Sequence, residues 1–416
     1  MEKNDDVIKV GDYIIIQRQK FTKLYKFASL ETTVTLGKET LELRQIEGQK
    51  FFTTFKMVSK NPANPKKRFY SLEACSEITS DIRAFLNNTD SGQDNRDIKI
   101  NDNSQNLSQQ EIEALRKSGA SSTNIIGQLV ENSKTFTSKT EFGQEKYLKK
   151  KERKYFEYVQ VRKPSIRLLA EMFYRQDPEK ILFLRQDTLS QLISYSNVNE
   201  SGTYLLYESG TQGLLPATLM NSIGANTKGR LLHMHQGPFG QKLALQALNL
   251  EEEHMKRCLS VNIFSSLKMF HNREEEIVEE SEPAAKKIKL DDEIPTENGD
   301  AKKKEKPKWY FENLEAVKML DEKVDGLVIV AREHPWSILM TLLPFVKPNR
   351  NIVIYHNVKE VLTDVFLDLK AGSKVTAVKL TSNWMRNYQV LPNRTHPEVQ
   401  MGGNSGYLLT GIVVES

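Results

Sequence analysis

The spacing of apolar residues in this chain changes along its length, and it first indicates strands. Between residues 10 and 57, β-branched and aromatic residues come in short runs at spacings of about ten residues. Gly11, Gly37 and Gly48 separate these runs. Short strands divided by turn residues are typical of a small antiparallel barrel or sandwich. Residues 1–86 are therefore predicted to form a small β-barrel domain.

A polar segment and then helical spacing follow the strands. Residues 87–105 are rich in Asn, Asp and Ser, which predicts a loop. Ser108 and Glu111 have the spacing of a capping box, and apolar helical spacing begins at Ile112. Residues 87–180 are thus predicted to be a loop and a basic helical connector.

From residue 181 onward, buried strands alternate with helical segments, which predicts a mostly parallel sheet. The predicted strands cover residues 203–208, 230–235, 259–263, 325–331 and 351–355, followed by an antiparallel edge pair at 375–380 and 406–414. The predicted fold class is α/β, with a small N-terminal β-barrel followed by a degenerate Rossmann-like domain over residues 181–416.

Residues 274–306 interrupt this domain with twelve acidic and seven basic residues and no aromatic residue. Such a segment cannot bury enough apolar surface to order itself, so a disordered insertion is predicted. Within it, Lys286, Lys287 and Lys289 resemble a monopartite nuclear-localisation signal that an importin binds. This predicts a nuclear protein, although the nearby lysines at 302–304 show that short basic clusters also arise by chance.

Composition limits the number of domains and the kind of protein that this chain can be. The chain has 416 residues, enough for two domains, and its net charge of +5 permits nucleic-acid binding without requiring it. Cys75 and Cys258 lack zinc-type spacing and are expected to be reduced thiols. No apolar run approaches the ~20 residues of a membrane span, and the first residues lack a secretory leader.

The densest positive charge lies in residues 146–167. This segment contains nine basic and only two acidic residues, with tyrosines interleaved among them. Lysine and arginine contacts to phosphates dominate nucleic-acid affinity, and aromatic rings stack on unpaired bases. A nucleic-acid-binding segment is one interpretation; a solvated helix face is the other.

The turn that follows residues 203–208 indicates whether the domain has room for a cofactor. In a doubly wound sheet, the first crossover cradles the cofactor, and a methyltransferase needs small residues there. Here Gln212 and Leu214 are expected to fill that space. The second strand ends at His235 without an acid, and after the fourth strand only Glu333 remains, beside Arg332. These departures predict a chain that binds no S-adenosylmethionine and is not an enzyme.

Two alternatives stay open. An active methyltransferase with an atypical pocket would use Glu208 and Glu333 for the cofactor and the base. A nuclear scaffold would use the α/β domain for protein contacts alone. His233 and His235 could be metal ligands, but no third ligand is evident, which favours an ordinary packed or hydrogen-bonded role and no metal.

Four stretches resemble a known family: NSKTFTSKTEF at 132–142, QEKY at 144–147, KPS at 163–165 and RNYQVLPNRTHP at 386–397. They are similar to the non-catalytic subunit of the eukaryotic tRNA (adenine(58)-N(1))-methyltransferase. The resemblance covers nearly the whole chain, and residues 386–397 are its most specific part. The turn at 210–214 departs from the pattern of the catalytic subunit.

The resemblance implies a heterotetramer of two catalytic and two non-catalytic subunits, in which the catalytic partner holds S-adenosylmethionine and this chain helps to bind tRNA. It also implies RNA contacts at Asp102, Asn103, Gln105, Lys149, Lys150, Lys151, Arg153, Lys154, Tyr155, Arg185, Gln186, Asp187, Thr188, Arg394, Thr395 and His396. Without the resemblance, Arg185 is an ordinary surface cation, and Arg394 and His396 fix a turn between Pro392 and Pro397.

Overall fold

The structure is a computed structural model that describes residues 6–60, 68–75, 91–92, 94, 104–117, 122–155, 157–281, 307–391, 394–399 and 401–415. The chain divides into two compact units. The first consists of Met1–Pro164 and Arg386–Met401, and the second of Ser165–Met385 and Gly402–Ser416. None of the described helices has the length and apolar character needed to cross a bilayer.

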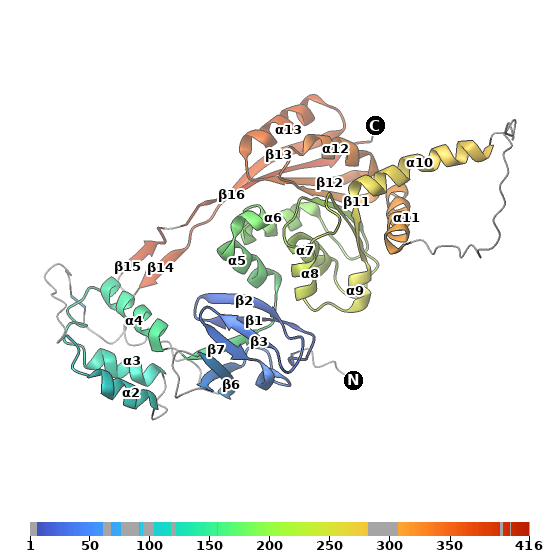
Figure 1. Cartoon of the computed structure of the whole chain (residues 1–416). Coiled ribbons are helices and arrows are strands. Elements are labelled where there is room, and N and C mark those ends of the chain that lie inside the picture. The colour runs from blue at the N-terminus through green and yellow to red at the C-terminus, as the bar shows by residue number, and fades with distance from the viewer. Residues whose placement is uncertain are drawn as a thin grey trace, which may run out of the picture. The chain divides into compact units, whose positions relative to one another are not determined.

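A seven-stranded sheet in the order β2-β1-β7-β5-β6-β4-β3 makes up most of the first unit (Figure 1). Its strands are β1 (Tyr13–Arg18), β2 (Phe21–Lys26), β3 (Thr33–Leu36), β4 (Glu39–Glu42), β5 (Thr54–Ser59), β6 (Phe69–Cys75) and β7 (Tyr158–Arg162). A short 3-10 helix, η1 (Arg44–Ile46), follows β4. Ile14, Ile16, Phe55 and Leu72 are fully buried in its core. This nearly closed sheet confirms the predicted β-barrel.

The barrel draws β7 from the segment that the sequence assigned to the connector, so it does not end at residue 86. Ile16 of β1 pairs with Val161, and Phe55 of β5 pairs with Val159. Val159 and Val161 are buried, so β7 supplies both hydrogen bonds and core surface. This strand was missed in the sequence because its apolar alternation is short and lies within a basic segment.

Three helices of the first unit share a small core of their own. They are α2 (Gln109–Lys117), α3 (Ser122–Glu131) and α4 (Glu141–Tyr155). Ile126, Leu129, Phe136 and Leu148 are buried among them. The predicted capping box is confirmed, because the backbone N–H and the hydroxyl of Ser108 each donate to Glu111 at 2.8 Å.

The second unit is built on a seven-stranded sheet in the order β10-β9-β8-β11-β12-β16-β13. Its strands are β8 (Thr203–Glu208), β9 (Arg230–His235), β10 (Cys258–Asn262), β11 (Val324–Val330), β12 (Val346–His356), β13 (Val375–Trp384) and β16 (Asn404–Val413). The five neighbouring strands β10, β9, β8, β11 and β12 run parallel to one another. Strand β16 runs antiparallel to both of its neighbours, β12 and β13. This confirms the Rossmann-like sheet and its antiparallel edge pair.

Helices cover both faces of this sheet (Figure 1). They are α5 (Ile166–Gln176), α6 (Gln186–Ser196), α7 (Leu214–Ile223), α8 (Leu243–Ala247), α9 (Glu252–Lys256), α10 (Ile263–Ser281), α11 (Lys308–Asp321), α12 (Trp336–Leu342) and α13 (Lys359–Ala371), with 3-10 turns η3 (Pro178–Ile181) and η4 (Leu343–Phe345). Leu205 and Tyr207 point from β8 into a core shared with α11, α12 and α13. Successive strand residues alternate, so Tyr204 and Leu206, also buried, face the opposite layer.

Several predicted boundaries differ from the structure. The second unit begins at Ser165 rather than at 181, since α5 belongs to it. Helix α10 continues to Ser281, into the insertion predicted from residue 274, because the Glu-rich run there has high helix propensity. The remainder of that insertion, with Lys286, Lys287 and Lys289, lies outside the described residues.

Between β13 and β16 the chain forms a separate hairpin of β14 (Tyr388–Leu391) and β15 (Arg394–Pro397). Gln389 pairs with His396, and Val390 pairs with Thr395. The hairpin groups with the first unit, whereas the sequence placed it in the α/β domain.

Candidate functional site

The direction of strand order in the second unit reverses between β8 and β11, and open α/β sheets bind ligands at such a point. The turn from β8 into α7 lies there. Gly210 and Gly213 adopt positive φ angles of 110° and 78°, which favour glycine. Gln212, between them, has a φ of 56°, and its carbonyl accepts from the backbone N–H of Ala244 at 2.9 Å. The turn is therefore fixed by the segment that follows β9.

That segment, rather than the turn itself, lies against the glycines. The side-chain oxygen of Gln241 accepts from the backbone N–H of Gln212 at 2.5 Å. A Cβ on Gly210 would lie 2.8 Å from the amide nitrogen of Gln241. Gln241 lines the hollow of about 420 Å³ beside the turn, and Gln212 and Leu214 do not. The sequence predicted that Gln212 and Leu214 fill this space, but neither lines the hollow, and Leu214 is fully buried in the core.

Glu208, at the end of β8, is held inside the protein. It is 1% exposed, and the hydroxyl of Thr211 donates to its carboxylate. Its other oxygen lies 3.2 Å from Nε2 of His233, without the alignment of a hydrogen bond, and neither atom has another hydrogen-bond partner. Glu208 therefore serves contacts within the domain.

Glu333, after β11, joins the ends of three strands. Its carboxylate accepts from the Tyr207 hydroxyl, from the Ser209 hydroxyl at 2.8 Å and from the Gln236 amide at 3.0 Å. Burial acts to raise the pKa of Glu333, but the hydrogen bonds from Tyr207, from Ser209 and from backbone N–H groups outweigh it and hold the pKa below its usual value. The expected partner, Arg332, instead points its guanidinium at the carbonyl of Glu179, 3.5 Å away. Both carboxylates of the atypical-enzyme alternative thus have intramolecular partners.

The two histidines of β9 have hydrogen-bonding roles. Nδ1 of His233 lies 3.1 Å from the Ser260 hydroxyl, and Nδ1 of His235 lies 2.9 Å from the carbonyl of Gly237. Burial lowers the pKa of His235, and the neighbouring His233 lowers it further. Within the described part of the chain, no three His, Cys, Asp or Glu side chains form a group that could hold a metal ion.

The basic segment lies largely on α4, where its lysines differ in availability. Lys149 pairs with Glu145 at 2.7 Å, and Nζ of Lys151 lies 5.1 Å from the centre of the Tyr147 ring. Lys146 and Lys150 are exposed to solvent. Arg153 and Lys154 continue the same helix, but their side chains lie outside the described residues. The exposed lysines are the available cations among the described side chains of this segment.

The aromatic residues of this segment mostly support the helices. Tyr155 is 5% exposed in the helical core, and the Tyr147 hydroxyl donates to the carbonyl of Leu129 at 3.2 Å. Tyr158 is 4% exposed in the barrel. Tyr155 was predicted as an RNA contact, but a buried ring cannot stack on a base. Its place in the helical spacing of α4 was the signal for burial.

Arg185 is buried and not the surface cation expected from sequence alone. Its side chain is 4% exposed and donates to Asp187 at 2.7 and 2.8 Å. It also donates to the carbonyls of Gly402 and Gly403, at 3.0 Å each. Thr188 is buried and donates to the carbonyl of Ser405 at 3.1 Å, while Gln186 is half-buried. This cluster joins the start of α6 to the start of β16.

The other predicted contacts are scattered. Thr395 and His396 are exposed on β15, and Arg394 belongs to the same strand, although its side chain is not among those described. Gln105 forms a bridge with Ser133, and its side-chain amide atoms are buried without a hydrogen-bond partner. Asp102, Asn103 and Pro392 lie outside the described residues.

The fold and the closed turn define a methyltransferase-like α/β protein joined to a β-barrel. The chain belongs to the Gcd10p family, whose sequence profile matches residues 7–293. This confirms the resemblance that the four sequence stretches indicated.

Named relatives and a solved structure agree with this assignment. The chain is 30% identical, over 99% of its length and 89% of the relative, to the mouse tRNA (adenine(58)-N(1))-methyltransferase non-catalytic subunit TRM6. It is also 30% identical to the subunit of that name from Dictyostelium discoideum, over 100% of this chain and 81% of the relative. A SAM-dependent O-methyltransferase from Thermotoga maritima superposes with a TM-score of 0.51 at 9% identity, covering 100% of this chain and 97% of its own, which shows the fold alone.

Replacing Arg185 by Met should destabilise the second unit, because Asp187 and two backbone carbonyls lose their donor. We expect the free energy of unfolding to fall by about 3–5 kcal/mol. Arg167→Met, at an exposed ion pair with Glu171, is the control and should cost less than about 1 kcal/mol. Urea unfolding at neutral pH measures both. A stable Arg185→Met protein that binds tRNA poorly would instead support the RNA-contact role.

The same ion pair predicts a dependence on pH. Burial acts to raise the pKa of Asp187, but the hydrogen bond and charge of Arg185 outweigh it and lower the pKa. The pair therefore stabilises the fold above the ordinary pKa of an aspartate, and this contribution is lost as pH falls through the lowered value. The stability difference between the wild type and Asp187→Asn should shrink over that acidic range. A constant difference would contradict this.

Proposed function

We propose that this chain is the non-catalytic, tRNA-binding subunit of a tRNA (adenine(58)-N(1))-methyltransferase and supports a catalytic subunit that holds S-adenosylmethionine. The names of its full-length relatives support this role. The observation that carries it is the strand-to-helix turn, where Gln241 is hydrogen-bonded to the backbone and Glu333 accepts from neighbouring side chains, which leaves few free groups for a cofactor.

The assembly we propose is a heterotetramer of two catalytic and two non-catalytic subunits in the nucleus. An importin would recognise Lys286, Lys287 and Lys289. The family membership supports the catalytic partner, and the basic cluster in the sequence supports nuclear import.

Binding of tRNA is supported by the exposed lysines of α4. Lys146 and Lys150 can reach phosphates without breaking an internal contact, whereas Lys149 is already paired with Glu145. Thr395 and His396, exposed on β15, offer further contacts. Arg185 would act through the fold, because its donors are already used. The RNA contact would thus be chiefly electrostatic, which separates this proposal from a scaffold without RNA contact.

The full chain alone should not bind S-adenosylmethionine, because Gln241 is hydrogen-bonded to the turn and the carboxylates of Glu208 and Glu333 accept hydrogen bonds from neighbouring side chains. Isothermal titration calorimetry should show no saturable heat for the chain. The assembled complex should bind one cofactor per catalytic subunit and none per non-catalytic subunit. A second equivalent in the complex, or tight binding by the chain, would favour the atypical-enzyme alternative.

Changing Lys146 and Lys150 to alanine in the assembled complex should weaken tRNA binding. Each lost phosphate contact should also reduce the slope of log affinity against log salt by roughly one unit or less. Lys318→Ala with Lys359→Ala removes the same charge from two exposed sites on α11 and α13 and should leave the slope unchanged. Cofactor affinity on the catalytic subunit is the test of assembly. An unaltered slope in the α4 variant would identify a solvated helix face.

Changing Lys286, Lys287 and Lys289 to alanine should leave a tagged chain in the cytoplasm when it is expressed without its catalytic partner. Changing the lysines at 302–304 removes an equal charge from the same stretch and is the matched control. The nuclear-to-cytoplasmic ratio measures both. Nuclear accumulation of the first variant, or an equal loss in the control, would count against the signal.

A further inference from the structure

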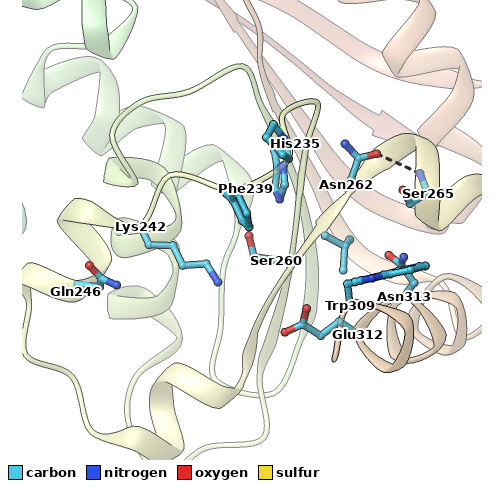
Figure 2. Close-up of a pocket in the computed structure, with 13 residues that line it drawn as sticks. His235, Phe239, Lys242, Gln246, Ser260, Asn262, Ser265, Trp309, Glu312 and Asn313 are labelled. Carbon is cyan, nitrogen blue, oxygen red and sulfur yellow. Dashed lines mark hydrogen bonds between the residues drawn. The ribbon is translucent and has the colours of Figure 1, made fainter. Parts of the chain in front are cut away.

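A second hollow, of about 770 Å³, lies at the carboxyl ends of β9 and β10, next to the closed turn (Figure 2). Its volume is in the range of small-molecule sites. His235, Phe239, Lys242, Asn262, Trp309 and Glu312 are among the residues that line it. The contacts that close the turn leave this neighbouring space open.

Two aromatic rings line this hollow with little protein covering them. Phe239, in the segment after β9, is 88% exposed, and Trp309, in the first turn of α11, is 57% exposed. They lie on different sides of the hollow (Figure 2). Large exposed rings at a concave site are stacking surfaces, and nucleobases stack on them with any sequence. The rings therefore favour a flat aromatic ligand.

The framework that presents these rings is fixed. The side-chain amide of Asn262 donates to the carbonyls of Gln236 and Gly237, at 2.7 and 3.1 Å, which holds the start of the Phe239 segment. A Cβ on Gly240 would collide with the Ser260 hydroxyl, so only glycine lets the backbone pass this close. On the other side, Ser266 donates to the buried Asn313 at 2.9 Å and anchors α11.

The charged side chains at the hollow are of the kinds that bind the phosphate and the polar groups of a nucleotide. Lys242 extends its amine toward the side on which Trp309 and Glu312 lie, and it forms no ion pair with any described residue (Figure 2). Glu312 is paired with Lys308 at 3.4 Å. A lysine beside stacking rings can hold a phosphate, and a carboxylate can accept from a base amino group or a ribose hydroxyl.

We propose that this hollow binds a nucleobase with its ribose phosphate, with the base stacked on Trp309 or Phe239 and the phosphate held by Lys242. The base can come from a free mononucleotide or from an unpaired position of RNA. The RNA source rests on the proposed tRNA-binding function, and the mononucleotide source does not. This hollow shares His235 and Phe239 with the smaller hollow beside the turn, but neither Gly210 nor Gln241 lines it.

The test titrates the full chain with AMP and with a short oligoadenylate, with and without abasic positions. Trp309→Ala should weaken binding of the base-containing oligonucleotide by roughly 5- to 150-fold, the equivalent of a lost base stack. It should leave the abasic oligonucleotide unaffected. Phe311→Ala is the matched control, because Phe311 lies on the same helix, is also 57% exposed and does not line the hollow. It should change binding less than about twofold.

The salt dependence of binding and the comparison of AMP with the oligonucleotide identify where the bound base comes from. Trp309→Ala should not change the salt slope, whereas Lys242→Ala should lower it by roughly one unit or less. Loss of AMP binding in Trp309→Ala assigns a free nucleotide, and loss for the oligonucleotide alone assigns RNA. Equal binding of all probes by the wild type, by Trp309→Ala and by the double variant Phe239→Ala with Trp309→Ala overturns the proposal. So does a Trp309→Ala chain that binds RNA normally but fails to assemble with the catalytic subunit. Binding at this hollow without support of tRNA methylation would reject the proposed function alone.

Discussion

The hydrogen bonds to the carboxylate of Glu333 hold together the strand ends at which the α/β sheet of the second unit would bind a ligand. Tyr207 and Ser209 at the end of β8, and Gln236 after β9, all donate to it from the strand ends that meet at the switch point. A carboxylate with three donors is well satisfied and has no need of a ligand. Gln241 also contacts the turn at the point where such a sheet binds its ligand.

The sheet does not depend on that position being open. Its core lies between the strands and the two helix layers, where Leu205, Val328 and Ile354 are fully buried or nearly so. Gln241, Gln236, Ser209 and Glu333 are polar and lie beyond the strand ends, so they can change without altering core volume. This separation means that the turn can change while the fold is kept, and it is why function has to be argued from the site.

The sequence predicted what depends on local periodicity and missed what depends on distant contacts. The strand runs, the capping box at Ser108 and the final strand pair follow from spacing and were confirmed. Gln241 closes a turn 29 residues away, and Arg185 bonds to carbonyls 217 and 218 positions later. No window of local sequence contains both partners. Strand β7 was missed for another reason: its apolar alternation spans only five residues within a basic segment.

Charge alone is therefore a poor guide to which cations are exposed for the RNA contact that we propose. Arg185 and Lys149 have the same sign as Lys146 and Lys150, but the first two already bind carboxylates inside the protein. Moving them to a phosphate would leave Asp187 or Glu145 without its partner, and both acids are largely buried. A phosphate has to compensate for that loss before it gains affinity, whereas it gains at once from an exposed lysine. The RNA-binding surface that we propose therefore consists of exposed lysines, such as Lys146 and Lys150, that have no carboxylate partner among the described residues.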